Sequence, residues 1–541
     1  MRSRRTLVLF LLLGLFRTLH SQPAVAPPKL AVIIVVDQMR ADYIDRFQRD
    51  WSRGLKRLIT DGAWFRNAAY PYLGTVTCPG HATISTGAFP HVHGIPANQW
   101  WDRDAGRQMA CTEDPAVTNL GYDGPGQEHN SGYRLKVPTF ADVMRTERGA
   151  HVVTLSVKTR SAIMLAGHGG DAVTWMSEPL DTWLTSTAFA RALVPEVKTF
   201  IAANPVDADF GKSWTRLLPA SRYRDPDDDQ FERPPPGWTQ AFPHAFNGTA
   251  GKPDASFRVQ WDISPFADAY TGRMAAALVE TMRLGRHDTT DVLGVSFSAT
   301  DRVGHKFGPR SQEIQDQLAR LDRTIGDLLD RLDAAVGKNQ YVVALSADHG
   351  VTPIPEQLQR AHLDAGRVNI NDIVARIESK LGPALGAGAH VAKLDGRDMN
   401  LYFLPGVYQK LVASPALLAD VVEAIESVRG VRRVYRAEQL RSVPAAGDAW
   451  LRAAALSYVE GRSGDMVISV RPQWISSAEA ATHGSATSDD QRVPILFMGN
   501  GIKPGRYDQA ATPADIAPTL AKLCGITLPN AEGRPLTAAL R

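Results

Sequence analysis

Two kinds of apolar pattern alternate along this chain of 541 residues. Short runs rich in β-branched residues lack a polar face, which is typical of strands buried on both sides in a parallel sheet. Such runs cover residues 29–38, 151–158, 291–301, 340–350 and 493–501. Residues 311–335 instead repeat apolar positions every three or four residues, the pattern of an amphipathic helix. The alternation predicts an α/β fold with a mostly parallel central sheet flanked by helices.

Further helices are predicted over residues 47–63, 137–149 and 513–525, each of which ends at or beside a glycine. The helix over 311–335 has an apolar face made of Ile314, Leu318, Leu321, Ile325, Leu328, Leu329 and Leu332. Two long segments, 175–290 and 355–470, fit the alternation poorly. We expect both to be insertions that cap the edge of the sheet where the strands end, the second containing a small α/β subdomain.

The N-terminus carries a targeting pattern. MRSRR is basic, TLVLFLLLGLF is an apolar run of 11 residues, and the chain then turns polar and Pro-rich. This order predicts a secretory signal peptide over residues 1–22 and a catalytic domain over residues 23–541. The alternative is an uncleaved N-terminal anchor. No later run reaches transmembrane length, so we expect no stable membrane association after cleavage.

Cysteine content and net charge bear on where the protein is located and on whether it binds nucleic acid. Cys78, Cys111 and Cys524 cannot form a disulfide framework and lack metal-ligand spacing. Export of such a Cys-poor chain, without eukaryotic processing signals, indicates a bacterial periplasmic or secreted protein. The net charge of +3 and the scattered basic residues predict no nucleic-acid partner.

Acidic residues and histidines follow several predicted strands. They lie at the end of AVIIVVD and in the blocks DRVGH, ADHG and THGS: Asp37, Asp301, His305, Asp348, His349 and His483. In open α/β sheets ligands bind beyond the carboxyl ends of the strands. Carboxylates and imidazoles without thiolates form a donor set that suits zinc, and these donors suffice for two ions. The alternative is a helix cap, a surface histidine and a turn without a metal.

A hydroxyl stands out before another predicted helix. Thr77 precedes Cys-Pro-Gly-His, where we expect a sharp turn and a helix around residues 81–86. A hydroxyl at a helix N-terminus lies in positive potential, which favours an incoming anion. Taken alone, Thr77 is equally well explained as an N-cap. We interpret the neighbouring His81, His91 and His93 as structural.

The motifs VVDQMR, TVTCPGHATISTG, SVKTRSAI, DRVGH, SADHG and THGS, with the region of Asn98, together resemble the alkaline phosphatase superfamily over nearly all of the mature chain. The chain is most similar to the phosphate-irrepressible alkaline phosphatases, near the nucleotide pyrophosphatase/phosphodiesterase branch. By this resemblance two zinc ions are held, one by Asp37, Thr77, Asp348 and His349, the other by Asp301, His305 and His483. The resemblance makes Thr77 the nucleophile, and the phosphoryl oxygens are bound by Asn98, Lys158 and Arg160.

The resemblance implies a zinc-dependent phosphomonoesterase of broad specificity that acts on small-molecule phosphate esters through a covalent phosphothreonine. Lys158 and Arg160 alternate on a segment that we expect to be extended, so their side chains should point the same way. Phosphomonoesterase members carry this Lys-x-Arg pair; the alternative is a phosphodiesterase or nucleotide pyrophosphatase on the same metal core. A non-enzymatic, metal-stabilised binding protein is a third hypothesis.

Two related activities are disfavoured by the motifs. Sulfatases of the superfamily require Cys-x-Pro-x-Arg, whereas Cys78 is followed directly by Pro79. No motif matches the magnesium site or the Arg clamp of the Ser-nucleophile enzymes, so we expect no obligatory magnesium. We expect a monomer.

Overall fold

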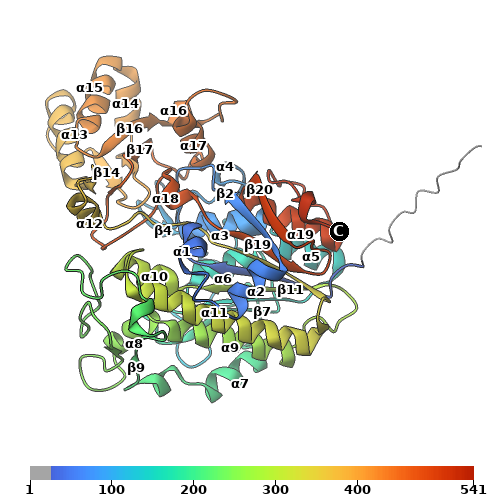
Figure 1. The fold of residues 1–541 in the computed structure, drawn as a ribbon. Helices are drawn as coiled ribbons and strands as arrows, with labels where there is room; N and C mark the ends of the chain where they lie inside the picture. The colour runs from blue at the N-terminus through green and yellow to red at the C-terminus, as the bar shows by residue number, and fades with distance from the viewer. Residues whose placement is uncertain (1–25) are drawn as a thin grey trace, which may run out of the picture.

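The computed structural model describes residues 26–541, so the predicted signal peptide lies outside the described residues. Within that range, no helix has both the length and the apolar character needed to cross a membrane. The elements that the apolar pattern predicts are arranged around one large sheet (Figure 1).

Five parallel strands form the centre of this sheet. In spatial order they are β12 (Tyr341–Ser346), β1 (Leu30–Val36), β11 (Asp291–Phe297), β6 (Val152–Ser156) and β7 (Ala172–Met176). Every residue of these strands is buried, as the absence of a polar face predicts. The predicted mostly parallel α/β sheet is confirmed.

Five further strands, placed on both sides of these, extend the sheet to ten. Beyond β12 lie β19 (Ile495–Gly499), β2 (Ala63–Ala68) and β20 (Gly505–Ala511). Beyond β7 lie β8 (Trp183–Ser186) and β5 (Asn119–Gly121). Strand β19 runs antiparallel to β12, so the parallel order is broken on that side.

Helices cover both faces of the sheet, and β1 shows how. Its even-numbered residues pack into one hydrophobic cluster and its odd-numbered residues into another, because successive side chains of a strand point to opposite faces. The first cluster includes α9 (Pro265–Thr281) and α11 (Gln312–Leu332). The second includes α5 (Phe140–Arg148) and α19 (Ile516–Cys524). All seven apolar residues predicted for the α11 face lie in the first cluster.

The predicted helix over 47–63 is only partly formed. The structure has α2 over Gly54–Asp61, preceded by an irregular segment. A tertiary contact sets this boundary, since Asp322 of α11 accepts hydrogen bonds from the backbone N–H groups of Ser52, Arg53 and Lys56. A carboxylate that satisfies free N–H groups stabilises a helix start at that point.

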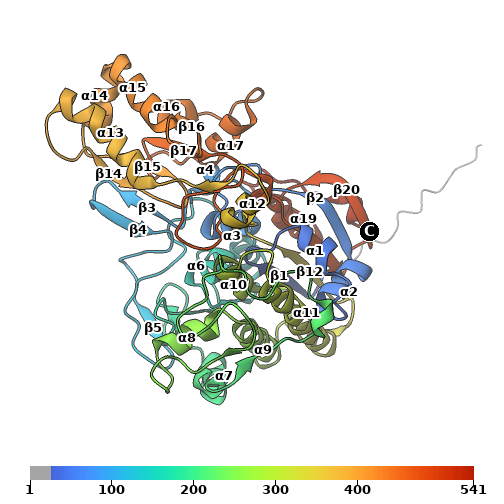
Figure 2. The ribbon, with the colours of Figure 1, turned by 60° about the vertical axis from the view of Figure 1, so that its left-hand side comes forward.

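The chain between β12 and β19 builds a second lobe with a hydrophobic core of its own (Figures 1 and 2). A four-stranded antiparallel sheet forms its floor: β14 (Val391–Leu394), β15 (Asn400–Phe403), β17 (Met466–Val470) and β16 (Val431–Arg436). Helices α13 (Ile370–Leu385) and α15 (Pro415–Glu426) pack on this sheet. Residues 175–290, in contrast, contribute to the main hydrophobic core, because Trp183, Trp214 and Trp261 pack in the same cluster as β1.

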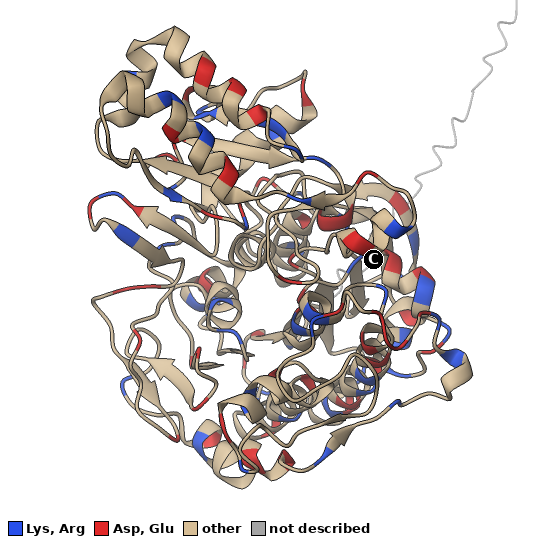
Figure 3. Cartoon of the chain, turned by 90° about the vertical axis from the view of Figure 1, so that its left-hand side faces the viewer, with Lys and Arg blue, Asp and Glu red and all other residues tan. Residues whose placement is uncertain are grey.

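A β-hairpin of the main body contacts the second lobe (Figure 2). It consists of β3 (Gln99–Asp102) and β4 (Arg107–Ala110). Gln108 donates a 3.2 Å hydrogen bond to Asp395, and Arg103 forms a 3.0 Å ion pair with Asp465. The lobe is therefore held against the segment that follows Asn98. Acidic and basic residues are interspersed over both parts (Figure 3).

Candidate functional site

Four polar side chains meet at the carboxyl edge of the central strands. Asp37 directly follows β1, while Asp348 and Lys158 each lie two residues beyond the ends of β12 and β6. Asp301 lies in the first turn of α10 (Ala299–Phe307), the helix that follows β11. Because these strands are neighbours, the four side chains converge, and none is more than 2% exposed.

The structure brings the predicted metal donors into two overlapping groups. Within residues 26–541, one group joins Asp37, Asp348 and His349, and the other joins Asp301, His349 and His483, with donor atoms less than 4.8 Å apart. His349 is common to both. His305 adjoins the second group, since its Nε2 lies 3.2 Å from Oδ1 of Asp301. All six residues predicted as carboxylate or imidazole donors therefore lie together.

His305, His349 and His483 share one pattern of hydrogen bonding. Nδ1 of each lies 2.8–2.9 Å from a backbone carbonyl oxygen: Ala481 for His305, Gly350 for His349 and Thr75 for His483. An Nδ1–H donated to a carbonyl fixes the tautomer and leaves Nε2 as the free donor atom. In each case this Nε2 faces a carboxylate of the cluster.

Several of these atoms are buried without a hydrogen-bond partner. Among the described residues, this holds for Oδ1 of Asp37, Oδ2 of Asp348 and Nε2 of His349, which all belong to the first group. Buried polar atoms are nearly always paired, so three such atoms side by side need another partner. Their number, their chemistry and their convergence fit a bound metal ion.

Burial and mutual charge shift the acid–base behaviour of the cluster. Burial, reinforced by the charge of Asp348, raises the pKa of Asp37. Burial would also raise the pKa of Asp301, but the charges of His305 and Lys158 outweigh it and lower that pKa well below its usual range. Burial and the nearby His349 lower the pKa of His483 well below that of free histidine, which keeps its imidazole neutral and able to bind a metal.

Lys158 links the two donor groups. Its Nζ lies 2.7 Å from Oδ2 of Asp37 and 2.5 Å from Oδ2 of Asp301, one carboxylate from each group. The ammonium is almost fully buried, so it offsets part of a negative charge that would otherwise be costly to bury. A cation in this position can also reach an anion bound between the groups.

Thr77 begins a buried helix. The helix α3 spans Thr77–Thr86 and thus starts four residues before the expected position. Its N-cap is Val76, so the interpretation of Thr77 as a simple N-cap is wrong. Thr77 is the first residue of the helix and is almost fully buried, so its hydroxyl lies at the positive end of the helix.

Asn98 lies beside Thr77 through the backbone of Cys78. Oδ1 of Asn98 accepts a 2.7 Å hydrogen bond from the Cys78 N–H, and the Asn98 carbonyl accepts one of 2.9 Å from the N–H of Cys111. Cys78 and Cys111 form a disulfide, while Cys524 is a buried free thiol. Sequence reasoning did not assign this disulfide, because a spacing of 33 residues carries no local signal.

Arg160 occupies a different backbone setting from the one expected. Lys158 is the N-cap of α6 (Thr159–Ala166), and Arg160 lies in the first turn of that helix. The expectation of an extended segment at this point is therefore wrong. The guanidinium is half-buried, with Nη1 3.8 Å from Glu178, a distance too long for a hydrogen bond.

His81 is closer to the site than its structural interpretation implied. Its Nδ1 lies 2.9 Å from the Thr77 carbonyl and 3.2 Å from Oδ2 of Asp348, and its Nε2 lies 2.8 Å from Ser296. Gly80 makes this approach possible, because a Cβ there would lie 2.3 Å from the Asp348 carbonyl oxygen. The four-residue spacing of Thr77 and His81, one helical turn, was the available signal.

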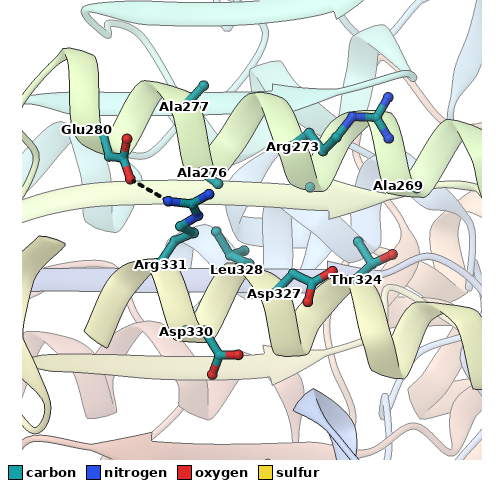
Figure 4. A pocket seen from close by; sticks show the side chains of 11 residues that line it. Ala269, Arg273, Ala276, Ala277, Glu280, Thr324, Asp327, Leu328, Asp330 and Arg331 are labelled. Carbon is teal, nitrogen blue, oxygen red and sulfur yellow. Dashed lines mark hydrogen bonds and ion pairs between the residues drawn. The ribbon is translucent and has the colours of Figure 1, made fainter. Parts of the chain in front are cut away.

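A groove also lies on the surface away from the metal-donor groups. It measures about 620 Å³, runs between α9 and α11, and is lined by Arg273, Asp327 and other charged residues (Figure 4). Arg331 there is paired with Glu280 at 3.4 Å. None of the candidate donors lines this groove, so we assign the chemistry to the strand ends. The second lobe borders the donors instead, since Arg397 and Trp474 line a small cavity with His483.

Comparison with known proteins identifies the family of the chain. A sequence model described as "Type I phosphodiesterase / nucleotide pyrophosphatase" matches residues 31–491, a span that includes every candidate donor. The chain belongs to this family.

Within the family, the chain is similar to proteins named alkaline phosphatases. It is 32% identical to alkaline phosphatase PafA of Elizabethkingia meningoseptica, covering 96% of this chain and 95% of the relative. It is 33% identical to alkaline phosphatase PhoK of a Sphingomonas species, covering 94% and 90%. The crystal structure of wild-type PafA superimposes with a TM-score of 0.86 at 30% identity, covering 96% of this chain and all of that one. Murine ectonucleotide pyrophosphatase/phosphodiesterase 5, at 14% identity and a TM-score of 0.55, shares the fold.

Proposed function

We propose that this protein is an alkaline phosphatase that hydrolyses phosphate monoesters with broad substrate specificity. Its full-length relatives at about 30% identity carry that name, whereas murine pyrophosphatase/phosphodiesterase 5 is only 14% identical to the chain. The observation that carries the proposal is the position of the Thr77 hydroxyl at the start of α3, beside two groups of preorganised donors. It is a hydrolase that depends on metal ions.

Two zinc ions are the metals that the donor chemistry favours. One would be held by Asp37, Asp348, His349 and Thr77, and the other by Asp301, His305 and His483. Zinc bound there would supply Lewis-acid stabilisation of the attacking and leaving oxygens. The fixed tautomers of the histidines support this assignment, because each presents Nε2 without any rearrangement.

The residues of the chain divide the chemical work. The Thr77 oxygen attacks phosphorus, the bond to the leaving alcohol breaks, and the alcohol departs with a proton. Water then cleaves the phosphothreonine and releases inorganic phosphate, which restores the hydroxyl. During both steps the amide of Asn98 and the cations Lys158 and Arg160 hold the non-bridging oxygens of the phosphoryl group.

The balance between monoester and diester hydrolysis depends on Lys158 and Arg160. A monoester presents one more charged oxygen than a diester, and the two cations are suited to that charge. The burial of Lys158 strengthens its electrostatic interaction with a bound anion. This argues for the monoesterase over the diesterase alternative.

A single comparison tests the proposal. Release of p-nitrophenol from p-nitrophenyl phosphate and from bis-p-nitrophenyl phosphate is measured with the zinc-loaded protein, whose zinc content is determined in parallel. We expect kcat/KM to be far higher for the monoester. A higher value for the diester would favour the phosphodiesterase, and bound zinc without turnover of either substrate would favour a binding protein.

The proposal includes a location in the bacterial periplasm or outside the cell. The disulfide between Cys78 and Cys111 is of a kind that persists in oxidising compartments, which supports export to a bacterial periplasm or beyond. Two zinc ions, small phosphate esters as substrates and a monomeric state complete the proposal.

A further inference from the structure

Gln38 contacts both donor groups at once. Its backbone N–H donates a 3.1 Å hydrogen bond to Oδ1 of Asp348, and its side-chain Nε2 donates one of 2.7 Å to Oδ1 of Asp301. The two carboxylates belong to different groups of three donors. Gln38 is fully buried and directly follows Asp37, so it lies between the two groups.

The backbone of Gln38 is held in an uncommon conformation. Its φ of 66° lies in the left-handed region, which side chains other than glycine seldom adopt. Such a conformation persists only where the surroundings impose it. Here it lets the backbone N–H and the side-chain amide of one residue reach two different carboxylates.

Gly304 provides the space for this amide. A Cβ at position 304 would lie 1.8 Å from Oε1 of Gln38, and the next two nearest atoms also belong to that amide. Gly304 lies inside α10, between Asp301 and His305, where glycine weakens a helix relative to alanine. The loss of helix stability at Gly304 is explained if the side-chain amide of Gln38 occupies the space that a side chain at position 304 would fill.

We propose that Gln38 is a positioning residue that fixes the carboxylates of both metal groups in one geometry, and that Gly304 is present to admit its amide. This deepens the proposed function, because it rests on the two groups being metal sites. The amide donates to Oδ1 of Asp301, the oxygen that Nε2 of His305 and Nε2 of His483 also face, while Lys158 donates to Oδ2. Hydrogen bonds that orient metal ligands commonly change metal affinity by about 10–100-fold when removed.

The contact is tested first in the metal-free protein, with a double-mutant cycle. Gly304→Ala should lower the midpoint of thermal unfolding clearly when Gln38 is present. In the Gln38→Ala background the clashing amide is gone, so the same change should have little effect. Equal destabilisation in both backgrounds would overturn the proposal. Gly272→Ala is the control, because a Cβ there would meet Thr324 at 2.5 Å and its effect should not depend on residue 38.

The positioning role is tested by zinc affinity, measured by competition with a chelator. Gln38→Met keeps a side chain of similar length but removes the donor, and we expect at least one zinc to bind about 10–100-fold more weakly. Gly304→Ala should weaken zinc binding in the same direction, although it leaves Gln38 in place. Zinc affinities within twofold of wild type in both variants would overturn the role. A wild-type protein that binds no zinc would refute the proposed function instead, and the metal-free cycle would still report on the contact.

Discussion

The side-chain oxygen of Asn98 accepts a 2.7 Å hydrogen bond from the backbone N–H of Cys78, the residue after Thr77. Because Oδ1 of Asn98 accepts this bond, the NH₂ group of the same amide remains available to donate a hydrogen bond to a substrate. Asn98 is thereby oriented by the same helix start that carries the Thr77 hydroxyl. The disulfide from Cys78 to Cys111 ties the two segments covalently.

Replacement of Asn98 should therefore impair turnover more than folding. In Asn98→Ala, the phosphoryl group loses one charge-assisted donor, worth about 1.5–3 kcal/mol, or roughly 10–100-fold in kcat/KM. Asn98→Asp should be worse, because it adds a negative charge beside the substrate. Steady-state kinetics of both variants on p-nitrophenyl phosphate provide the measurement. Activity of Asn98→Asp equal to wild type would refute the orientation we infer.

Thr77→Ala should reduce kcat by about three orders of magnitude or more, since it removes the proposed nucleophile. Thr77→Ser keeps a hydroxyl and should keep partial activity. Zinc content and the thermal midpoint should change little in either variant. Trapping of phosphate on the protein by acid quench, followed by mass spectrometry, checks the role directly. Near wild-type turnover by Thr77→Ala would remove Thr77 from the mechanism.

Arg160→Ala should separate the two ester classes, because Arg160 is not one of the proposed metal ligands and its ion-pair partner is Glu178. Its loss should lower kcat/KM for a monoester by about 10–100-fold and for a matched diester much less. The Lys158→Ala/Arg160→Ala double variant should widen this difference. An equal loss on both esters would return support to the phosphodiesterase alternative.

Metal removal should abolish activity without unfolding the protein, and added zinc should restore it. The Lys158 ammonium lies between Asp37 and Asp301 and offsets their charge when no metal is bound. Lys158→Met should therefore destabilise the metal-free protein by about 3–5 kcal/mol, the usual effect of removing one partner of a buried ion pair. The zinc-loaded protein should lose less. Chemical denaturation with and without chelator gives both values, and equal losses would contradict this role of Lys158.

A buried acid away from the site should make stability depend on pH. Burial, with the charges of Glu313 and Asp229, raises the pKa of Glu232 from 4.5 to about 10, and both its carboxylate oxygens lack a hydrogen-bond partner among the described residues. Between these values the folded state keeps a proton that the unfolded state has released, so stability falls as pH rises.

Glu232→Gln should therefore stabilise the protein by about 1–3 kcal/mol near pH 8, and the gain should vanish below about pH 4. Unfolding free energies across that pH range provide the measurement. Asp228→Asn changes an exposed acid in the same loop whose charge raises this pKa less than those of Glu313 and Asp229, so it is the control and should have a much smaller effect. A stabilisation that does not depend on pH would contradict the raised pKa.

Much of the site could be predicted because it is built from local patterns. The runs of β-branched residues define the buried strands, and a parallel sheet places their carboxyl ends at one edge. Asp37, Asp348 and Lys158 follow such strands within two residues, so their convergence follows from the sequence and the sheet. The apolar face of α11 is determined in the same local way.

Other features depend on contacts between distant parts of the chain. The start of α2 is set by Asp322, roughly 270 residues away, and the disulfide of Cys78 joins segments that no periodicity connects. The left-handed backbone of Gln38 and its fit against Gly304 arise only when β1 and α10 are packed together. Sequence alone determined which residues are candidates for the chemistry, because strand ends and short motifs are local. The tertiary structure decided how these residues are oriented, because hydrogen bonds and steric limits between distant segments exist only after folding.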